Sequence, residues 1–254
     1  MNPIIAKIGP LYIYSYGLMV ALGFALAIFL AYREAPRFNI NRDKIVDFGI
    51  VILLGGLAGA RLFYVFMNIR YYIAHPLETV NITKGGLVWY GGFLIGILIG
   101  IIFVKKNKMS FWDGADLMAP FIALAQSVGR IGCFLNGCCY GTAAPKDFAL
   151  GVIFPFEETL RHPTQIYESA VLLMLFIILR KWQDVRHFKG EIFIGYAMLY
   201  SLSRFVIEFF RGDNPKIFVG LTIGQVLSVI IGLVCLIILV VRFNLWKKNS
   251  SRSA

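Results

Sequence analysis

Residues 129–141 read Gly129-Arg130-Ile131-Gly132-Cys133-Phe134-Leu135-Asn136-Gly137-Cys138-Cys139-Tyr140-Gly141, and this stretch decides how the rest of the chain is interpreted. It begins near the end of an apolar run, 117–135, that is long enough for a membrane helix. An arginine at a bilayer centre costs about 2.5–3.5 kcal/mol on insertion scales. The four glycines let the backbone bend or approach a bound group closely. A cation beside a pliable turn at membrane depth indicates an anionic ligand that itself lives in the membrane.

The composition predicts an all-α, polytopic membrane helical bundle. Of the 254 residues, 58% are hydrophobic and 15% are charged, and the mean hydropathy is +0.72. A soluble globular protein of this length is not so apolar. We therefore expect a single integral membrane domain over residues 1–254. The net charge of +11 would also suit a nucleic-acid-binding protein, but its distribution along the chain favours membrane topology.

Seven apolar segments approach the length that crosses a hydrocarbon core of about 30 Å. They cover residues 11–32, 48–67, 86–104, 115–135, 164–180, 191–210 and 221–241. The first is too long to be the core of a cleaved signal peptide, which spans about 7–15 residues. The connection 136–163 is polar and contains Pro145 and Pro155, so we expect it to have structure of its own.

The lysines and arginines predict the orientation of these segments. The connections after the first, third and fifth segments and the tail after the seventh hold 15 of them, and the opposite side holds 7. Because positive residues stay on the cytoplasmic side, we expect the N-terminus outside and the C-terminus in the cytoplasm. The same orientation places Tyr16, residues 85–92, the connection 136–163 and the loop 210–220 toward the outer face.

Three arginines lie within the predicted segments: Arg61, Arg130 and Arg204. One interpretation is that each pairs with a carboxylate, as Glu208 lies one helical turn after Arg204. That interpretation leaves Arg130 without a partner nearby in the sequence. The other is that two guanidinium groups face one cavity and bind a phosphodiester in bidentate fashion. Arg61 follows the glycine-rich residues 55–59 and either serves the same cavity or extends its side chain to the interface.

Other polar residues are candidates for the same site. The segment 161–168 opens the fifth helix, where Pro163 and Glu168 are typical of a helix start. His162 is the histidine nearest to the proposed site. It could act there as a base or donate a hydrogen bond to the phosphate. Tyrosines also act as interfacial anchors, and three of them can donate to phosphate or glycerol oxygens: Tyr16, Tyr90 and Tyr200.

Three of the four cysteines are close in the sequence, at Cys133, Cys138 and Cys139. They lack paired C-x-x-C spacing and neighbouring histidines, so the sequence gives little support for a zinc site. A disulfide among them stays open. Cys235 lies in an apolar run and is expected to be a packing residue.

With these motifs the chain resembles the bacterial prolipoprotein diacylglyceryl transferases over essentially its whole length. The resemblance is carried by six motifs in order: Tyr16-Gly17-Leu18-Met19, Gly85-Gly86 with Gly91-Gly92, residues 129–141, His162-Pro163-Thr164-Gln165-Ile166-Tyr167-Glu168, residues 204–211, and Gly224-Gln225. It implies a multi-pass enzyme of the bacterial inner membrane whose active site faces the outer leaflet.

The resemblance also implies the reaction and its partners. Members of the family move the diacylglyceryl group from phosphatidylglycerol to the lipobox cysteine thiol at the signal peptide of a preprolipoprotein. A thioether forms and glycerol phosphate leaves, in the first step of lipoprotein maturation. No metal, organic cofactor or nucleic acid is implied.

Site residues follow from the same resemblance. Arg130 and Arg204 match the two essential arginines that hold the lipid phosphate. Other positions associated with the site are Tyr16, Asn136, Gly141, Tyr200 and Glu208. The chain departs from the commonest pattern at three positions, with Tyr90 in place of histidine, Cys133 in place of asparagine and Cys138 in place of glutamate. A histidine base therefore does not transfer to Tyr90, whose phenol, with a reference pKa near 10, is expected to donate a hydrogen bond.

Two rival functions come from other classes. An anion or lipid transporter with an arginine-lined path would need access from both faces, whereas the motif residues here gather toward one. An aspartic signal peptidase would need two facing aspartates. Asp113 and Asp116 lie near the predicted cytoplasmic start of the fourth segment, which is the wrong side for that chemistry.

Overall fold

A computed structural model describes residues 1–9, 11–81, 85–155, 157–212, 214–218 and 220–251. Two of the cations counted above, Lys84 and Arg252, lie outside the described residues. The chain forms two compact units, Met1–Ala31 with Ala115–Ala254, and Tyr32–Gly114. Each unit is described by itself.

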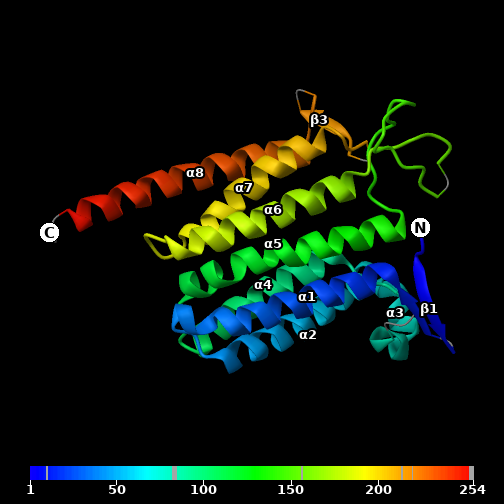
Figure 1. Ribbon diagram of the computed structural model, residues 1–254. Coiled ribbons are helices and arrows are strands. Elements are labelled where there is room, and N and C mark those ends of the chain that lie inside the picture. The colour runs from blue at the N-terminus through cyan, green and yellow to red at the C-terminus, as the bar shows by residue number, and fades with distance from the viewer. Residues whose placement is uncertain (10, 82–84, 156, 213, 219, 252–254) are drawn as a thin grey trace. The chain divides into compact units, whose positions relative to one another are not determined.

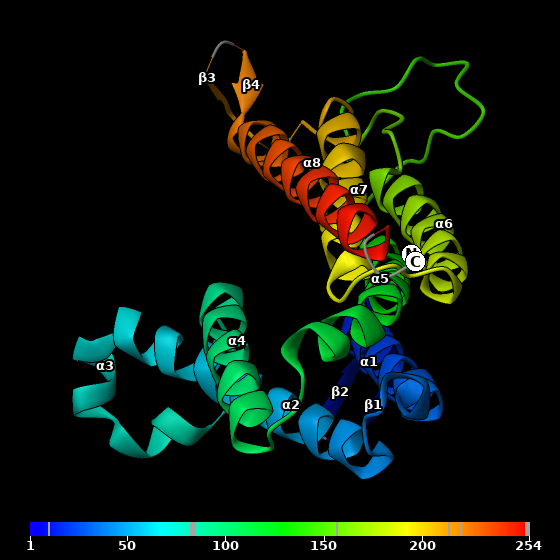
Figure 2. The same cartoon turned by 90° about the vertical axis from the view of Figure 1, so that its left-hand side faces the viewer.

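The first unit contains most of the long helices and both hairpins. Its elements are β1 (Ile4–Ile8), β2 (Leu11–Tyr14), α1 (Ser15–Glu34, except its last turn), α5 (Phe111–Asn136, except its first turn), α6 (Thr164–Asp184), α7 (Glu191–Glu208), β3 (Lys216–Phe218), β4 (Leu221–Thr222) and α8 (Ile223–Ser250). Helices α5, α6, α7 and α8 run alongside one another (Figure 1), and Figure 2 shows them turned by 90°.

The first helix begins at Ser15, four residues after the predicted start of the first span at residue 11. The predicted start was therefore wrong. Residues 11–14 form strand β2, which pairs antiparallel with β1 so that Tyr14 faces Ile4 and Tyr12 faces Lys7. Leu-Tyr-Ile-Tyr is rich in the residues that favour strands, and it follows a Gly-Pro pair that favours a turn. The ammonium group of Lys7 lies 5.0 Å from the centre of the Tyr12 ring.

Glycines let α1 and α5 approach closely. A Cβ added at Gly23 would lie 2.8 Å from the Ala125 carbonyl oxygen, and one added at Gly132 would lie 2.9 Å from Met19 Cβ.

Helix α5 continues through Gly129 and Gly132 to Asn136. The expected pliable turn begins only at Gly137, which has a φ of 73°. Arg130 consequently stands on a packed helix rather than on a flexible loop.

A buried core joins α5, α6 and α7. Its members are Ala119, Ala123, Leu172, Leu175, Leu179, Ile192 and Tyr196. The Ser127 hydroxyl lies within hydrogen-bond distance of Ser169, 2.8 Å from its carbonyl oxygen. Asp116 accepts hydrogen bonds from the backbone of Gly190 at 2.7 Å and of Phe193 at 2.9 Å. These bonds fix the start of α7 and give Asp116 a structural role, unlike that of a peptidase aspartate.

The second unit contains η1 (Ala35–Phe38), α2 (Arg42–Met67), α3 (Ile69–Ala74), η2 (Pro76–Val80) and α4 (Trp89–Lys106). The Asn41 side chain accepts a hydrogen bond from the Asp43 backbone at 2.9 Å and caps α2. Helices α2 and α4 pack through small residues. A Cβ added at Gly59 would lie 2.5 Å from Ile95 Cβ and 2.7 Å from the Gly91 carbonyl oxygen.

Among the described residues, five helical segments are long and apolar enough to cross a membrane: Ser15–Phe38, Arg42–Met67, Trp89–Lys106, Phe111–Asn136 and Ile223–Ser250. Helices α6 and α7 occupy the positions of the fifth and sixth predicted spans but are not among these five. The prediction of a helical protein with several membrane-crossing helices is therefore confirmed.

Candidate functional site

Two arginines share a carboxylate where three helices meet. Arg130 on α5 pairs with Glu168 on α6, with 2.8 Å between Nη2 and Oε1. Arg204 on α7 lies 3.6 Å from the other oxygen of Glu168. Arg204 also pairs with Glu208 one turn further along α7, at 2.8 Å. We call Arg130, Glu168, Arg204 and Glu208 the arginine–glutamate cluster.

The cluster has buried carboxylates and partly accessible guanidinium groups. The side chains of Glu168 and Glu208 are 5% and 0% exposed. Those of Arg130 and Arg204 are 24% and 19% exposed. Arg204 Nη1 is buried and donates no hydrogen bond to any described residue. This nitrogen faces Glu168 Oε2 at 3.6 Å, so charge attraction rather than a hydrogen bond holds it there.

Glu208 holds its end of the cluster rigidly. Its Oε1 accepts hydrogen bonds from Thr222 Oγ1 at 2.9 Å and from Asn214 Nδ2 at 2.5 Å. Thr222 also caps α8 in a reciprocal pair with Gln225. The interpretation in which Arg204 pairs with Glu208 is confirmed. Through Glu208, the position of Arg204 is tied to the start of α8.

Glu168 is the residue that the sequence analysis missed. It was interpreted as a charge that favours the start of a helix, whereas the structure places it 4% exposed between the two arginines. The available signal was a carboxylate on an otherwise apolar span, which needs a cationic partner. That partner, Arg130, lies on a different helix.

Three other predicted site residues lie near the cluster. Tyr200, one turn before Arg204, is close enough to interact with the charges of Glu168, Arg204 and Arg130. Tyr16 lies close enough to Arg130 and to the three clustered cysteines to be influenced by their charges. Asn136, at the end of α5, is within hydrogen-bonding reach of Cys138.

Gly141 and His162 lie together in the connection after α5. The Gly141 backbone donates to the His162 carbonyl oxygen at 2.8 Å. A Cβ added at Gly141 would collide with the Phe210 carbonyl oxygen, so only glycine fits there. The His162 ring packs against Phe148 and Phe210, and its Nδ1 lies 3.2 Å from the Tyr167 hydroxyl. This aromatic setting explains His162 as a packing residue, and its catalytic role stays a prediction.

The same connection has internal polar contacts. The Tyr140 hydroxyl donates to Glu157 at 2.7 Å, and Arg161 Nε donates to the other oxygen of Glu157 at 2.9 Å. These hydrogen bonds lower the pKa of Glu157. The carboxylate therefore stays ionised and links the two sides of the loop near neutral pH.

Arg61 and Tyr90 lie in the second unit. Tyr90 is 70% exposed near the start of α4, and its ring packs edge-on against Trp89. Arg61 is 8% exposed, and its guanidinium group lies 5.3 Å from the centre of the Tyr72 ring. It donates hydrogen bonds at 2.6–3.1 Å to the carbonyl oxygens of Glu78, Thr79, Gly85 and Gly86. These bonds give Arg61 a structural role before α4, and the roles predicted at the substrate site stay predictions.

We expect Arg61→Lys to lower the free energy of unfolding by about 2–4 kcal/mol, because a single ammonium group cannot replace the four hydrogen bonds that the guanidinium group donates to carbonyl oxygens. The measurement is thermal or denaturant unfolding of the purified protein in detergent. Arg70→Lys, at an exposed position on α3, is the matched control and should unfold like the unmodified chain. Unchanged stability in Arg61→Lys would contradict the structural role.

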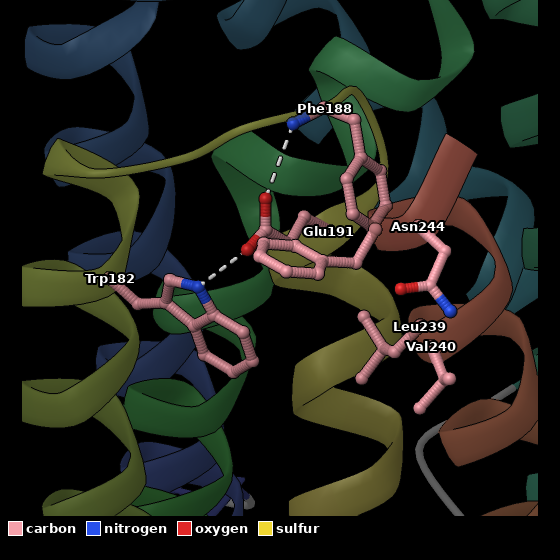
Figure 3. A pocket seen from close by; sticks show the side chains of 7 residues that line it. Trp182, Phe188, Glu191, Leu239, Val240 and Asn244 are labelled. Carbon is pink, nitrogen blue, oxygen red and sulfur yellow. Dashed lines mark hydrogen bonds between the residues drawn. The ribbon is translucent and has the colours of Figure 1, made fainter. Parts of the chain in front are cut away.

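A cavity of about 320 Å³ lies elsewhere in the first unit. It is lined mainly by apolar side chains of α6, α7, α8 and the connection before α7 (Figure 3). Its carboxylate, on Glu191, accepts hydrogen bonds from Trp182 Nε1 at 2.9 Å and from the Phe188 backbone at 3.2 Å. The cavity adjoins the opposite ends of α6 and α7 from the arginines. We therefore assign the site to the arginine–glutamate cluster.

The structure also brings three sulfur atoms together. Those of Cys133, Cys138 and Cys139 lie within 4.8 Å of one another. All four cysteines of the chain are free thiols. Because Cys133 is three residues after Arg130 on α5, it lies on the same face of that helix. The thiols are therefore neighbours of the arginine–glutamate cluster.

Comparison with known proteins identifies the family of the chain. A family model described as prolipoprotein diacylglyceryl transferase matches residues 3–241. Proteins from Bacillus cereus (strain G9842) and Bacillus mycoides (strain KBAB4), both named phosphatidylglycerol–prolipoprotein diacylglyceryl transferase, are 33% identical over 251 residues. Each alignment covers 95% of this chain and 92% of the relative. The chain belongs to the prolipoprotein diacylglyceryl transferase family.

Proposed function

We propose that this chain transfers the diacylglyceryl group of phosphatidylglycerol to a cysteine thiol of a prolipoprotein. The names of its family and of its relatives supply the two substrates. The observation that carries the proposal to particular residues is the pair of arginines on α5 and α7 that share Glu168. Two guanidinium groups with one carboxylate between them form a site for a phosphodiester.

The two arginines bind the lipid phosphate and stabilise the charge that develops on it. The acceptor sulfur, as thiolate, attacks the glyceryl carbon that carries the phosphate oxygen. The carbon–oxygen bond breaks, a carbon–sulfur bond forms, and glycerol phosphate leaves with the electron pair and the added negative charge. Donors fixed around a leaving phosphate stabilise the transition state more than the ground state. The rigid attachment of Arg204 through Glu208 serves this purpose.

Further roles in this reaction are proposed for the remaining predicted residues. Tyr200 and Tyr16 donate hydrogen bonds to phosphate or glycerol oxygens, and Asn136 and Gly141 shape the turn after α5. Tyr90 donates a hydrogen bond to the substrate, Arg61 contributes to substrate binding, and His162 acts as a base or as a hydrogen-bond donor to the phosphate. The acceptor is the lipobox cysteine at the signal peptide of a preprolipoprotein.

The enzyme spans the bacterial inner membrane with seven helices, which are the five apolar ones together with α6 and α7. It forms one domain. Its N-terminus lies outside and its C-terminus in the cytoplasm, as the distribution of cations favours. In this orientation the end of α5, the early turns of α6 and the end of α7 lie toward the outer leaflet. Arg130 and Arg204 then open to that leaflet. Phosphatidylglycerol reaches them from that leaflet.

The transporter alternative has no support from the family or from the relatives named above, which are described as transferases. The aspartic peptidase alternative loses one of its two candidate residues. Asp116 is fully buried, and its carboxylate is taken by Arg186 and by the backbone at the start of α7.

The test is direct transfer. Purified protein is incubated with phosphatidylglycerol and a lipobox peptide, and the peptide is weighed by mass spectrometry. We expect the peptide to gain one diacylglyceryl group, with glycerol phosphate released in equal amount, and a peptide with serine in place of the cysteine to gain nothing. A folded preparation that leaves the cysteine peptide unmodified would contradict the proposal.

A further inference from the structure

The three clustered thiols of Cys133, Cys138 and Cys139 have the arrangement of a metal-binding site. One zinc ion binds thiolates at about 2.3 Å, so three sulfurs around it stand about 4 Å apart. The sulfurs here lie within 4.8 Å of one another before any ion is considered. They come from two segments, the last turn of α5 and the turn that follows it. The sequence spacing alone did not predict this group of three thiols. One of the cysteines lies on a helix, and the other two are adjacent residues in the turn that follows it.

The backbone that carries the thiols is held in place. The Gln165 side chain donates to the Cys138 carbonyl oxygen at 2.7 Å, and the Thr164 hydroxyl donates to that of Cys139 at 2.9 Å. Cys139 adopts a left-handed conformation with a φ of 64°. Successive side chains of an extended chain point to opposite sides, and this unusual conformation is one that turns adjacent side chains toward the same side. Such positions in non-glycine residues are associated with functional sites.

The set of ligands is incomplete. Among the described residues, no histidine, aspartate or glutamate joins the three sulfurs to form a fourth ligand. A structural zinc site is closed by four protein ligands, whereas a catalytic one has three and keeps a position for water or substrate. Three thiolates with one zinc ion carry a net charge of −1, and the guanidinium group of Arg130 lies nearby.

We infer that Cys133, Cys138 and Cys139 bind a thiophilic divalent cation of the zinc type, and that its fourth position takes the acceptor thiol. The inference rests on the proposed function and names the group that activates its nucleophile. A free thiol with a pKa near 8.5 is only a few per cent ionised near neutral pH. Coordination to zinc deprotonates a thiol outright, so the metal provides the thiolate without a histidine base.

The step balances without a change of oxidation state. The acceptor thiol gives its proton to solvent as its sulfur binds the metal. The sulfur attacks the glyceryl carbon, the carbon–oxygen bond breaks, and glycerol phosphate leaves the arginines and takes up a proton. The thioether product is a weaker ligand than the thiolate and leaves the metal. Arg130 and Cys133 lie one helical turn apart on the same face, so the phosphate and the sulfur are held near each other, with the glyceryl carbon between them.

Two measurements test the site. Purified protein is reconstituted with zinc, and the bound metal is counted by mass spectrometry. We expect one zinc per chain, loss of that zinc in Cys133→Ser, Cys138→Ser and Cys139→Ser, and full retention in Cys235→Ser. The protein is then loaded with cobalt, whose sulfur-to-metal absorption reports the number of thiolate ligands. Adding a lipobox peptide should raise this absorption by about one third, as three thiolates become four, and a serine peptide should leave it unchanged.

The outcomes separate the inference from the proposed function. Absence of stoichiometric zinc would overturn the inference, and so would a cobalt spectrum that does not change when the cysteine peptide is added. Both measurements use the unmodified protein, so they hold even if a variant fails to fold. Transfer that continues at an unchanged rate after a chelator has removed the metal would also overturn it, and the proposed function would stand. If the peptide thiol enters the cobalt site but no diacylglyceryl group is ever added, the metal site stands and the proposed function fails.

Discussion

Arg130→Lys is expected to lower the transfer rate by at least about a hundredfold, comparable to the loss of one fixed donor to a developing anion. Lysine keeps the positive charge but loses the planar fork that can bind two oxygens at once. In this chain the fork also contacts Glu168 at 2.8 Å, and a shorter ammonium side chain cannot hold both that carboxylate and a phosphate. The measurement is kcat/KM for transfer to a lipobox peptide.

The matched control for Arg130→Lys is Arg180→Lys, on the far part of α6, where Arg180 bonds Gln183 and lies over the Phe121 ring. We expect this variant to keep the transfer rate within a few fold. Near-normal transfer by Arg130→Lys would show that charge alone suffices and would contradict bidentate binding.

Glu168→Gln is expected to lower kcat by about ten- to a hundredfold without raising the KM for phosphatidylglycerol. Glu168 neutralises and orients both arginines, since its two oxygens face Arg130 and Arg204 separately. Without its charge the guanidinium groups repel each other, and a displacement of about 1 Å can cost a hundredfold in rate. The greater positive charge still attracts the anionic lipid, so substrate binding is retained.

Steady-state kinetics with varied lipid separates the two parameters for Glu168→Gln. The control is Glu158→Gln, which removes a carboxylate at an exposed position in the connection before α6. This variant should change neither kcat nor KM. An increase in KM with an unchanged kcat would contradict the orienting role and would make Glu168 a substrate-binding residue instead.

Much of the fold follows from local features of the sequence. Apolar runs located the long helices to within about four residues, except at the start of α2 and the end of α8, and Glu208 one turn after Arg204 indicated their ion pair as one interpretation. The hairpin at residues 4–14 was missed because an apolar run of tyrosine and isoleucine does not distinguish a short strand from the start of a helix.

The parts of the site that depend on contacts between distant residues were not predictable. Glu168 and Arg130 are 38 positions apart, and only the packing of α5 against α6 makes them partners. Cys133 belongs to a helix and Cys138 and Cys139 to a turn, so a spacing rule written for one local loop does not detect them. Arg61 had equal claims to two roles until its four carbonyl partners were known.

The central claim is that Arg130 and Arg204 act on one phosphate as a unit. The most direct measurement is single-turnover transfer by Arg130→Lys, Arg204→Lys and the double variant. Residues that act as a unit have strongly non-additive effects, so we predict that the double variant is within a few fold of the slower single variant. Losses that multiply in the double variant would mean that the two arginines act independently, and would contradict a shared phosphate site.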